Sequence, residues 1–216
     1  MKISTAAHHT PLGDLAVRRS PQDPFAAVVL LHGGRADDLR PPPLLNLPAL
    51  RMRAFSATVT RALRGQAVLI AELRYRHRGW NGVRADAAQD ALGALARIRA
   101  CHGDIPVVLI GHSMGGRAAL RAAAHPSVRG VIALAPWCPP GEPVDHLAGR
   151  ELYLLHDEKD RITSARQSWD FVRLACAAGA VARGIPMPAG RHTMLRGGGL
   201  WHRRTAEIVA GMLSRR

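Results

Sequence analysis

The chain has 216 residues, 47% of them hydrophobic and 21% charged, which is the balance of a folded globular protein large enough for a core of its own. Lysine and arginine together number 30 against 16 acidic residues, a formal net charge of +14, and only Lys2 and Lys159 are lysines. The arginines are scattered and aromatic residues make up 4% of the chain. A nucleic-acid interface would gather cations on one face among aromatics, so we expect no specific nucleic-acid partner.

Other features of the sequence bear on the cellular location of the protein and on membrane and metal binding. No apolar run approaches the roughly 20 residues of a membrane span, and the start, MKISTAAHHTPLGDL, lacks the apolar segment of a signal peptide. Cys101, Cys138 and Cys176 are odd in number and lack metal-ligand spacing. We therefore expect free thiols, a cytoplasmic location, no membrane association and no metal. The oligomeric state stays open.

Short apolar runs alternate along the chain with longer segments of helical period. The expected strands are residues 26–34, 67–75, 105–111, 130–136 and 151–157, with a weaker one at 181–188. Expected helices cover 50–63, 84–100 and 115–124, a segment between Asp160 and Gly179 that begins after Thr163 or Ser164, and a last helix with Trp201, Thr205, Ile208 and Met212 facing inward.

The apolar strands are continuous rather than alternating, which indicates a mostly parallel, doubly wound α/β sheet with helices on both faces. We expect one domain over residues 1–216. Within residues 1–25 we expect edge strands, with 3–19 forming an antiparallel hairpin. Catalysis in such folds occurs at the carboxyl ends of the strands, and the candidate residues all fall there.

The segment LIGHSMGGRAAL contains G-x-S-x-G at Gly111, Ser113 and Gly115, between an expected strand and an expected helix. A sharp strand–serine–helix turn exposes the hydroxyl and brings neighbouring backbone too close for side chains, which explains the glycines. It also directs the N–H of Met114 and the amino end of the helix at a reacting carbonyl. With this motif the chain resembles the α/β-hydrolase family, specifically its small, cap-poor esterase-like members, from about Ala26 to the C-terminus.

The resemblance implies a Ser–acid–His triad in that chain order, an oxyanion hole after an earlier strand, and no cofactor. LLHGGR, residues 30–35, is similar to the family's His-Gly segment, which implies Gly34 as the second oxyanion donor beside Met114, with Arg35 as the alternative. His32 is expected to brace this loop.

Two acids and two histidines compete for the remaining roles. LYLLHDEKDRIT resembles the family's acid loop, and aligning His156 with its histidine gives Asp160 as the acid and Asp157 as the alternative. Only His192 and His202 follow the acid; His192 falls in the loop before the last helix and is the expected base, whereas His202 falls inside that helix.

The interval 137–150 is too short for a folded lid, so we expect an open site that prefers small or short-chain acyl groups. Arg35 and Trp137 are the expected substrate contacts. Leu44, Leu45 and Leu47, after three consecutive prolines, either line an acyl pocket beside Met114 and Trp137 or pack on the body of the protein.

These observations predict a serine hydrolase that cleaves a small carboxylic ester or thioester through an acyl-enzyme on Ser113. The alternatives are another triad chemistry on the same fold (peptidase, lactonase, dienelactone-type hydrolase or acyltransferase) and a non-catalytic binding member, because a fold does not choose among activities. Nucleotide binding fits poorly, since the chain has neither G-x-G-x-x-G nor a P-loop Lys-Ser/Thr.

Overall fold

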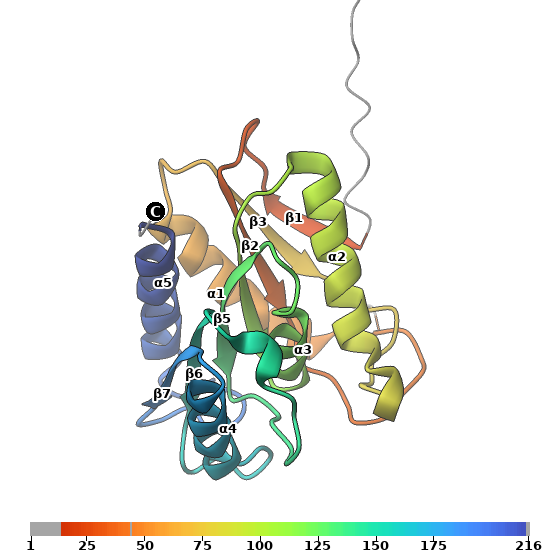
Figure 1. Cartoon of the computed structure of the whole chain (residues 1–216), viewed down its shortest axis with the longest axis vertical. Helices are drawn as coiled ribbons and strands as arrows, with labels where there is room; N and C mark the ends of the chain where they lie inside the picture. Colours follow the sequence, from red (N-terminus) through yellow and green to blue (C-terminus); the bar gives the residue numbers. More distant parts are fainter. Residues whose placement is uncertain (1–13, 44, 215–216) are drawn as a thin grey trace, which may run out of the picture.

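The computed structural model describes residues 14–43 and 45–214, and within them seven strands form one sheet (Figure 1). The strand order is β1-β3-β2-β4-β5-β6-β7; β1 is antiparallel to β3 and the other neighbouring pairs are parallel. The strands are β1 (Leu15–Arg19), β2 (Ala26–Leu31), β3 (Val68–Leu73), β4 (Val107–His112), β5 (Val128–Leu134), β6 (Glu151–His156) and β7 (Val181–Pro186).

Five α-helices of the described chain cover the two faces of the sheet. They are α1 (Leu47–Ala62), α2 (Asp86–His102), α3 (Met114–Ala122), α4 (Ala165–Ala177) and α5 (Gly198–Ser214). Helices α1 and α5 pack together on one face, and α2, α3 and α4 cover the other (Figure 1). Strands β2, β3 and β4 are buried along their whole length, as expected for parallel strands between two helical layers. The α/β sandwich expected from the sequence is confirmed.

The sequence-based expectations for the outer elements are also informative. Strand β1 lies at the sheet edge, antiparallel to its neighbour, as expected; the rest of the expected hairpin, residues 3–13, lies outside the described residues. Strand β7 forms the opposite edge and is largely exposed, which explains its weak apolar pattern. Ser164 is the N-cap of α4, and its side chain accepts a hydrogen bond from the Gln167 N–H.

The parallel register decides which loops meet above the sheet. Leu31 pairs with Gly111, so the segments that follow β2 and β4 leave the sheet side by side. Leu134 pairs with Leu155, and His156 pairs with Pro186, so the loops after β5, β6 and β7 emerge at the same edge. Segments separated by up to about 160 residues in the chain therefore converge at the carboxyl ends of the strands.

Candidate active site

Ser113 occupies a strained turn between β4 and α3. Its backbone φ is 55° and ψ is −118°, a conformation that a non-glycine residue adopts only when its surroundings enforce it. A Cβ on Gly111 would lie 2.2 Å from the Gly115 carbonyl oxygen, and a Cβ on Gly115 would lie 2.4 Å from the Leu31 carbonyl oxygen. The two glycines of the motif are thus required by close backbone contacts.

The loop after β2 lies against this turn. A Cβ on Gly33 would lie 3.4 Å from the Ser113 Cβ, so the loop backbone borders the serine directly. The Arg35 N–H donates to the Arg78 carbonyl at 2.9 Å, and it is therefore not free to bind an oxyanion. Within residues 14–43 and 45–214, by contrast, the N–H groups of Gly34 and Met114 have no hydrogen-bond partner.

His32 holds the loop from below. Its Nδ1–H donates to the Gly33 carbonyl at 2.7 Å, its Nε2 lies 3.3 Å from Asn46 Nδ2, and its ring packs edge-on against Tyr75. The bracing role expected from the sequence agrees with these contacts.

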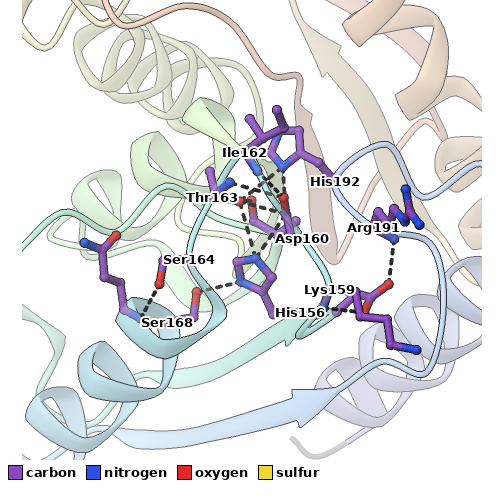
Figure 2. Close-up of polar contacts among 12 residues, drawn as sticks. His156, Lys159, Asp160, Ile162, Thr163, Ser164, Ser168, Arg191 and His192 are labelled. Atoms are coloured by element: carbon purple, nitrogen blue, oxygen red, sulfur yellow. Dashed lines mark hydrogen bonds and ion pairs between the residues drawn. The ribbon is translucent and has the colours of Figure 1, made fainter.

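The loops after β6 and β7 bring an acid and a histidine together, as Figure 2 shows. The His192 Nδ1–H donates to Asp160 Oδ2 at 2.9 Å. His156 Nε2 and Thr163 Oγ1 lie 3.1 and 2.9 Å from the same oxygen, and Oδ1 accepts the Ile162 N–H at 2.7 Å. This set of donors fixes the carboxylate in a single orientation.

The electrostatic consequence is a carboxylate that stays ionised. The Asp160 side chain is fully buried, and burial acts to raise the pKa of its carboxyl. The hydrogen bonds from His156 and His192 and from the Ile162 N–H outweigh burial and hold the pKa of Asp160 well below its usual range. Behind it, His156 is also fully buried, and its Nδ1 lies 2.8 Å from the Ser168 hydroxyl (Figure 2).

His112 connects the acid–histidine pair to the serine turn. This histidine directly precedes Ser113, and its Nε2–H donates to the His192 backbone carbonyl at 2.9 Å. The two imidazole rings lie 4.9 Å apart, centroid to centroid. Burial, followed by the electrostatic influence of His192 and Arg51, lowers the pKa of His112 to about 3, so its ring is neutral. The loop that carries His192 is thereby held beside the serine.

The competing acid and histidine lie elsewhere. Asp157 accepts the Lys159 N–H at 2.9 Å and the Arg191 N–H at 2.7 Å, so its carboxylate joins the two loops through the backbone. His202 is inside α5, with its ring edge-on to Phe55 at 4.4 Å. The structure brings together His192 and Asp160, and it keeps Asp157 and His202 in structural contacts.

The two expected substrate contacts differ in their surroundings. Arg35 lines a cavity of about 320 Å³, here called the loop cavity, together with Gly33, Gly34, Leu45 and Leu47. Leu45 and Leu47 are 79% and 69% exposed, so they do not pack on the protein body; Leu44 lies outside the described residues.

Trp137 belongs to a cluster on the other side of the serine turn. Its backbone N–H donates to the Ser113 carbonyl at 3.1 Å, and the Arg117 guanidinium lies 4.4 Å from its ring and 4.0 Å from that of Trp80. Glu142 accepts a hydrogen bond from Arg117 at 2.8 Å. Sequence reasoning missed this cluster and the Thr163 contact, because neither has a sequence motif.

The described residues contain no group of three or more histidine, cysteine or acidic side chains that could hold a metal ion. None of the described helices is long and apolar enough to cross a membrane.

Comparison with known proteins identifies the family. The model of the alpha/beta hydrolase fold matches residues 26–178, which is most of the chain. The protein belongs to the α/β-hydrolase fold family. This α/β hydrolase matches no curated protein in sequence.

Solved structures share the fold of this α/β hydrolase at low sequence identity. Est1E from Butyrivibrio proteoclasticus, solved with bound ferulic acid, has a TM-score of 0.65 at 12% identity, over 93% of this chain and 96% of that one. The esterase Est2 from Thermogutta terrifontis, solved with butyrate, has a TM-score of 0.66 at 16% identity, over 94% and 95%. A protein of unknown function from Agrobacterium tumefaciens has a TM-score of 0.70 at 14% identity, over 94% of each chain. The distant structural neighbours thus include esterases, and at these identities the likeness shows a shared fold.

Proposed function

We propose that this protein is a serine hydrolase that cleaves a small or short-chain carboxylic ester or thioester through an acyl-enzyme on Ser113. The observation that carries the proposal is the hydrogen bond from His192 to Asp160, held beside the strained turn of Ser113. This is the arrangement that a triad needs: a nucleophile, a base, and an acid that fixes the tautomer of the base.

In the proposed mechanism His192 Nε2 takes the proton of the Ser113 hydroxyl as Oγ attacks the substrate carbonyl. Asp160 holds the Nδ1–H of His192 and offsets the positive charge that forms on the imidazole. The N–H groups of Gly34 and Met114, which have no partner in the described chain, stabilise the oxyanion. His192 then protonates the leaving group, and water activated by the same histidine releases the acid.

The expected substrate is a small ester molecule. Arg35 in the wall of the loop cavity and Trp137 on the opposite side of the turn are the proposed substrate contacts. A cytoplasmic location stays a prediction that rests on the cysteine pattern.

The first test is covalent labelling of the serine. A fluorophosphonate probe should add once to the wild-type protein and not to Ser113→Ala, as read by intact mass. His192→Ala should lower kcat/KM on a short-chain ester by about 10⁴-fold or more, because triad members act as a unit. His202→Ala is the matched control and should retain activity within a few fold. Absence of labelling on the wild type, or equal losses in the two histidine variants, would contradict the proposal.

A further inference from the structure

Two more cavities lie along α1, and each shares lining residues with the next one in the series. The central cavity, of about 430 Å³, shares His32, Asn46 and two prolines with the walls of the loop cavity. The arginine cavity, of about 570 Å³, shares Arg18 and Glu72 with the central cavity. The shared walls make a series of three cavities that begins at the glycines beside Ser113 and ends between β1 and the second half of α1.

The far end of this series is strongly basic. The described residues that line the arginine cavity include a single carboxylate, that of Glu72, and five guanidinium groups, those of Arg18, Arg19, Arg53, Arg61 and Arg64. Arg18 neutralises Glu72 in an ion pair of 2.5 Å, and Arg19 donates to the Leu63 and Gln66 carbonyls rather than to an acid. Several guanidinium groups on one cavity favour a phosphate group, whose oxygens accept bidentate hydrogen bonds.

The middle of the series holds an unsatisfied acceptor. Glu72 is 8% exposed and lines both the central and the arginine cavity. Its Oε2 is paired with Arg18, while its Oε1 has no hydrogen-bond partner in the described chain. A buried carboxylate oxygen is unfavourable without a donor, so this position suits a ligand N–H or O–H. The floor beside it is apolar, formed by Leu30, Leu50 and Met52.

The length of α1 gives the span that a ligand would have to cover. Leu47, at the loop cavity, lies 6 residues before Arg53 and 14 before Arg61, which corresponds to roughly 9–21 Å along the helix at 1.5 Å per residue. A phosphate next to the scissile bond could not reach these arginines. The part of the ligand that links the reacting carbonyl to the phosphate must therefore be long and largely neutral. It must also carry an N–H or O–H donor at the level of Glu72.

We propose that the substrate is an acyl ester or thioester whose leaving group is a long neutral arm with an N–H or O–H donor and a terminal phosphate group. This inference rests on the proposed function of Ser113. Arg53, Arg61 and Arg64 are exposed, so this end is open to solvent, as suits a group that departs as the first product. Ser113 Oγ forms the acyl bond as the C–S or C–O bond to the arm breaks. The serine proton passes through His192 to the leaving thiol or alcohol, and water then releases the carboxylic acid.

The test uses three thioesters with the same acyl group: butyryl-coenzyme A, butyryl-pantetheine and S-butyryl-N-acetylcysteamine. Only the first carries phosphates, and pantetheine keeps the long arm. Butyryl-coenzyme A should exceed butyryl-pantetheine in kcat/KM by about tenfold or more at low salt, and the preference should fall as salt rises. Arg61→Ala/Arg64→Ala should remove the preference and leave hydrolysis of the N-acetylcysteamine thioester unchanged. The matched control, Arg183→Ala/Arg203→Ala, removes two exposed arginines from β7 and α5 and should keep the preference.

A binding measurement separates this inference from the proposed function. Coenzyme A should bind to Ser113→Ala in calorimetry, and adding Arg61→Ala/Arg64→Ala should weaken that binding by about tenfold or more. The protein could be labelled by the fluorophosphonate and hydrolyse the N-acetylcysteamine thioester, yet show no higher kcat/KM for butyryl-coenzyme A. This result would overturn the inference and leave the proposed function standing. Equal losses in the control double variant would also overturn it, because they would indicate a general effect of net charge. If neither a thioester nor a short-chain ester is hydrolysed and the fluorophosphonate does not label Ser113, the proposed function fails. The calorimetry still decides whether the arginine cavity binds the phosphate arm.

Discussion

His112 supports the loop of His192, and its burial is expected to lower the unfolding free energy of the protein in acid. It lies directly before Ser113, is 1% exposed, and uses its Nε2–H to hold the carbonyl of His192. Its Nδ1 has no hydrogen-bond partner within the described residues. A second proton on this ring would therefore be a buried charge without a partner, which agrees with its low pKa.

This position predicts a pH dependence of folding. Between pH 6.5 and about 3 the unfolded chain binds a proton on His112 that the folded chain does not. The unfolding free energy should therefore fall with decreasing pH in this window, by up to about 1.4 kcal/mol per pH unit from this group. His112→Gln keeps an N–H donor and does not titrate, so its unfolding free energy should depend less on pH. Urea denaturation of both proteins at pH 7 and pH 4.5 measures the two slopes, and equal slopes would contradict the account.

At the scale of elements, the strand–turn–helix unit from β4 to α3 depends on contact with a neighbouring strand. The backbone of α3 reaches the end of β2 so closely that only glycine fits at position 115. The same approach places the amino end of α3 beside the loop of Gly33 and Gly34, so it sets the spacing between the two proposed oxyanion donors, the N–H groups of Gly34 and Met114. The packing of β2 against α3 therefore requires glycine at position 115, in addition to the requirement of the turn itself.

A pair of glycine substitutions tests this packing. Gly115→Ala should lower the unfolding free energy by about 1–3 kcal/mol, because its Cβ would lie 2.4 Å from one backbone oxygen of β2. Gly211→Ala, in α5, meets nothing within 4 Å and should be neutral or stabilising by up to about 1 kcal/mol. Chemical denaturation compares the two variants, and a Gly115→Ala protein as stable as Gly211→Ala would show that the contact is looser than described.

At the scale of the whole molecule, the connection after β5 forms no helical lid above the sheet. The connection between β5 and β6, residues 135–150, contains a single 3-10 turn, Asp145–Leu147, and no longer helix. Glu142 in this connection pairs with Arg117 and Arg121 of α3, which holds the segment down on the body of the protein. Nothing in this segment is long enough to enclose an extended acyl chain.

The open site predicts a preference for short acyl groups. The kcat/KM for p-nitrophenyl butyrate should exceed that for p-nitrophenyl palmitate by about tenfold or more, because the connection between β5 and β6 forms no apolar cover that would bind the additional methylenes. Assays below the micelle concentration of the long ester keep the comparison valid. A preference for palmitate would contradict the open site.

The sequence by itself determined the features that depend on neighbours along the chain. Apolar runs and helical periods predicted each strand and helix near its observed place, and G-x-S-x-G between a strand and a helix predicted the strained turn at Ser113, because backbone crowding there is local. The weak pattern of β7 follows from its exposure at the edge. The resemblance to a family added the order of acid and histidine.

Only the tertiary structure decided which side chains meet. Asp157 and Asp160 are three residues apart and chemically alike, and just one of them faces His192. The choice depends on the parallel register of β6 and β7, which joins residues 32 apart in the chain. The hydrogen bonds of His156 and Thr163 and the cavities along α1 likewise arise from packing between distant segments, which leaves no periodicity or motif in the sequence.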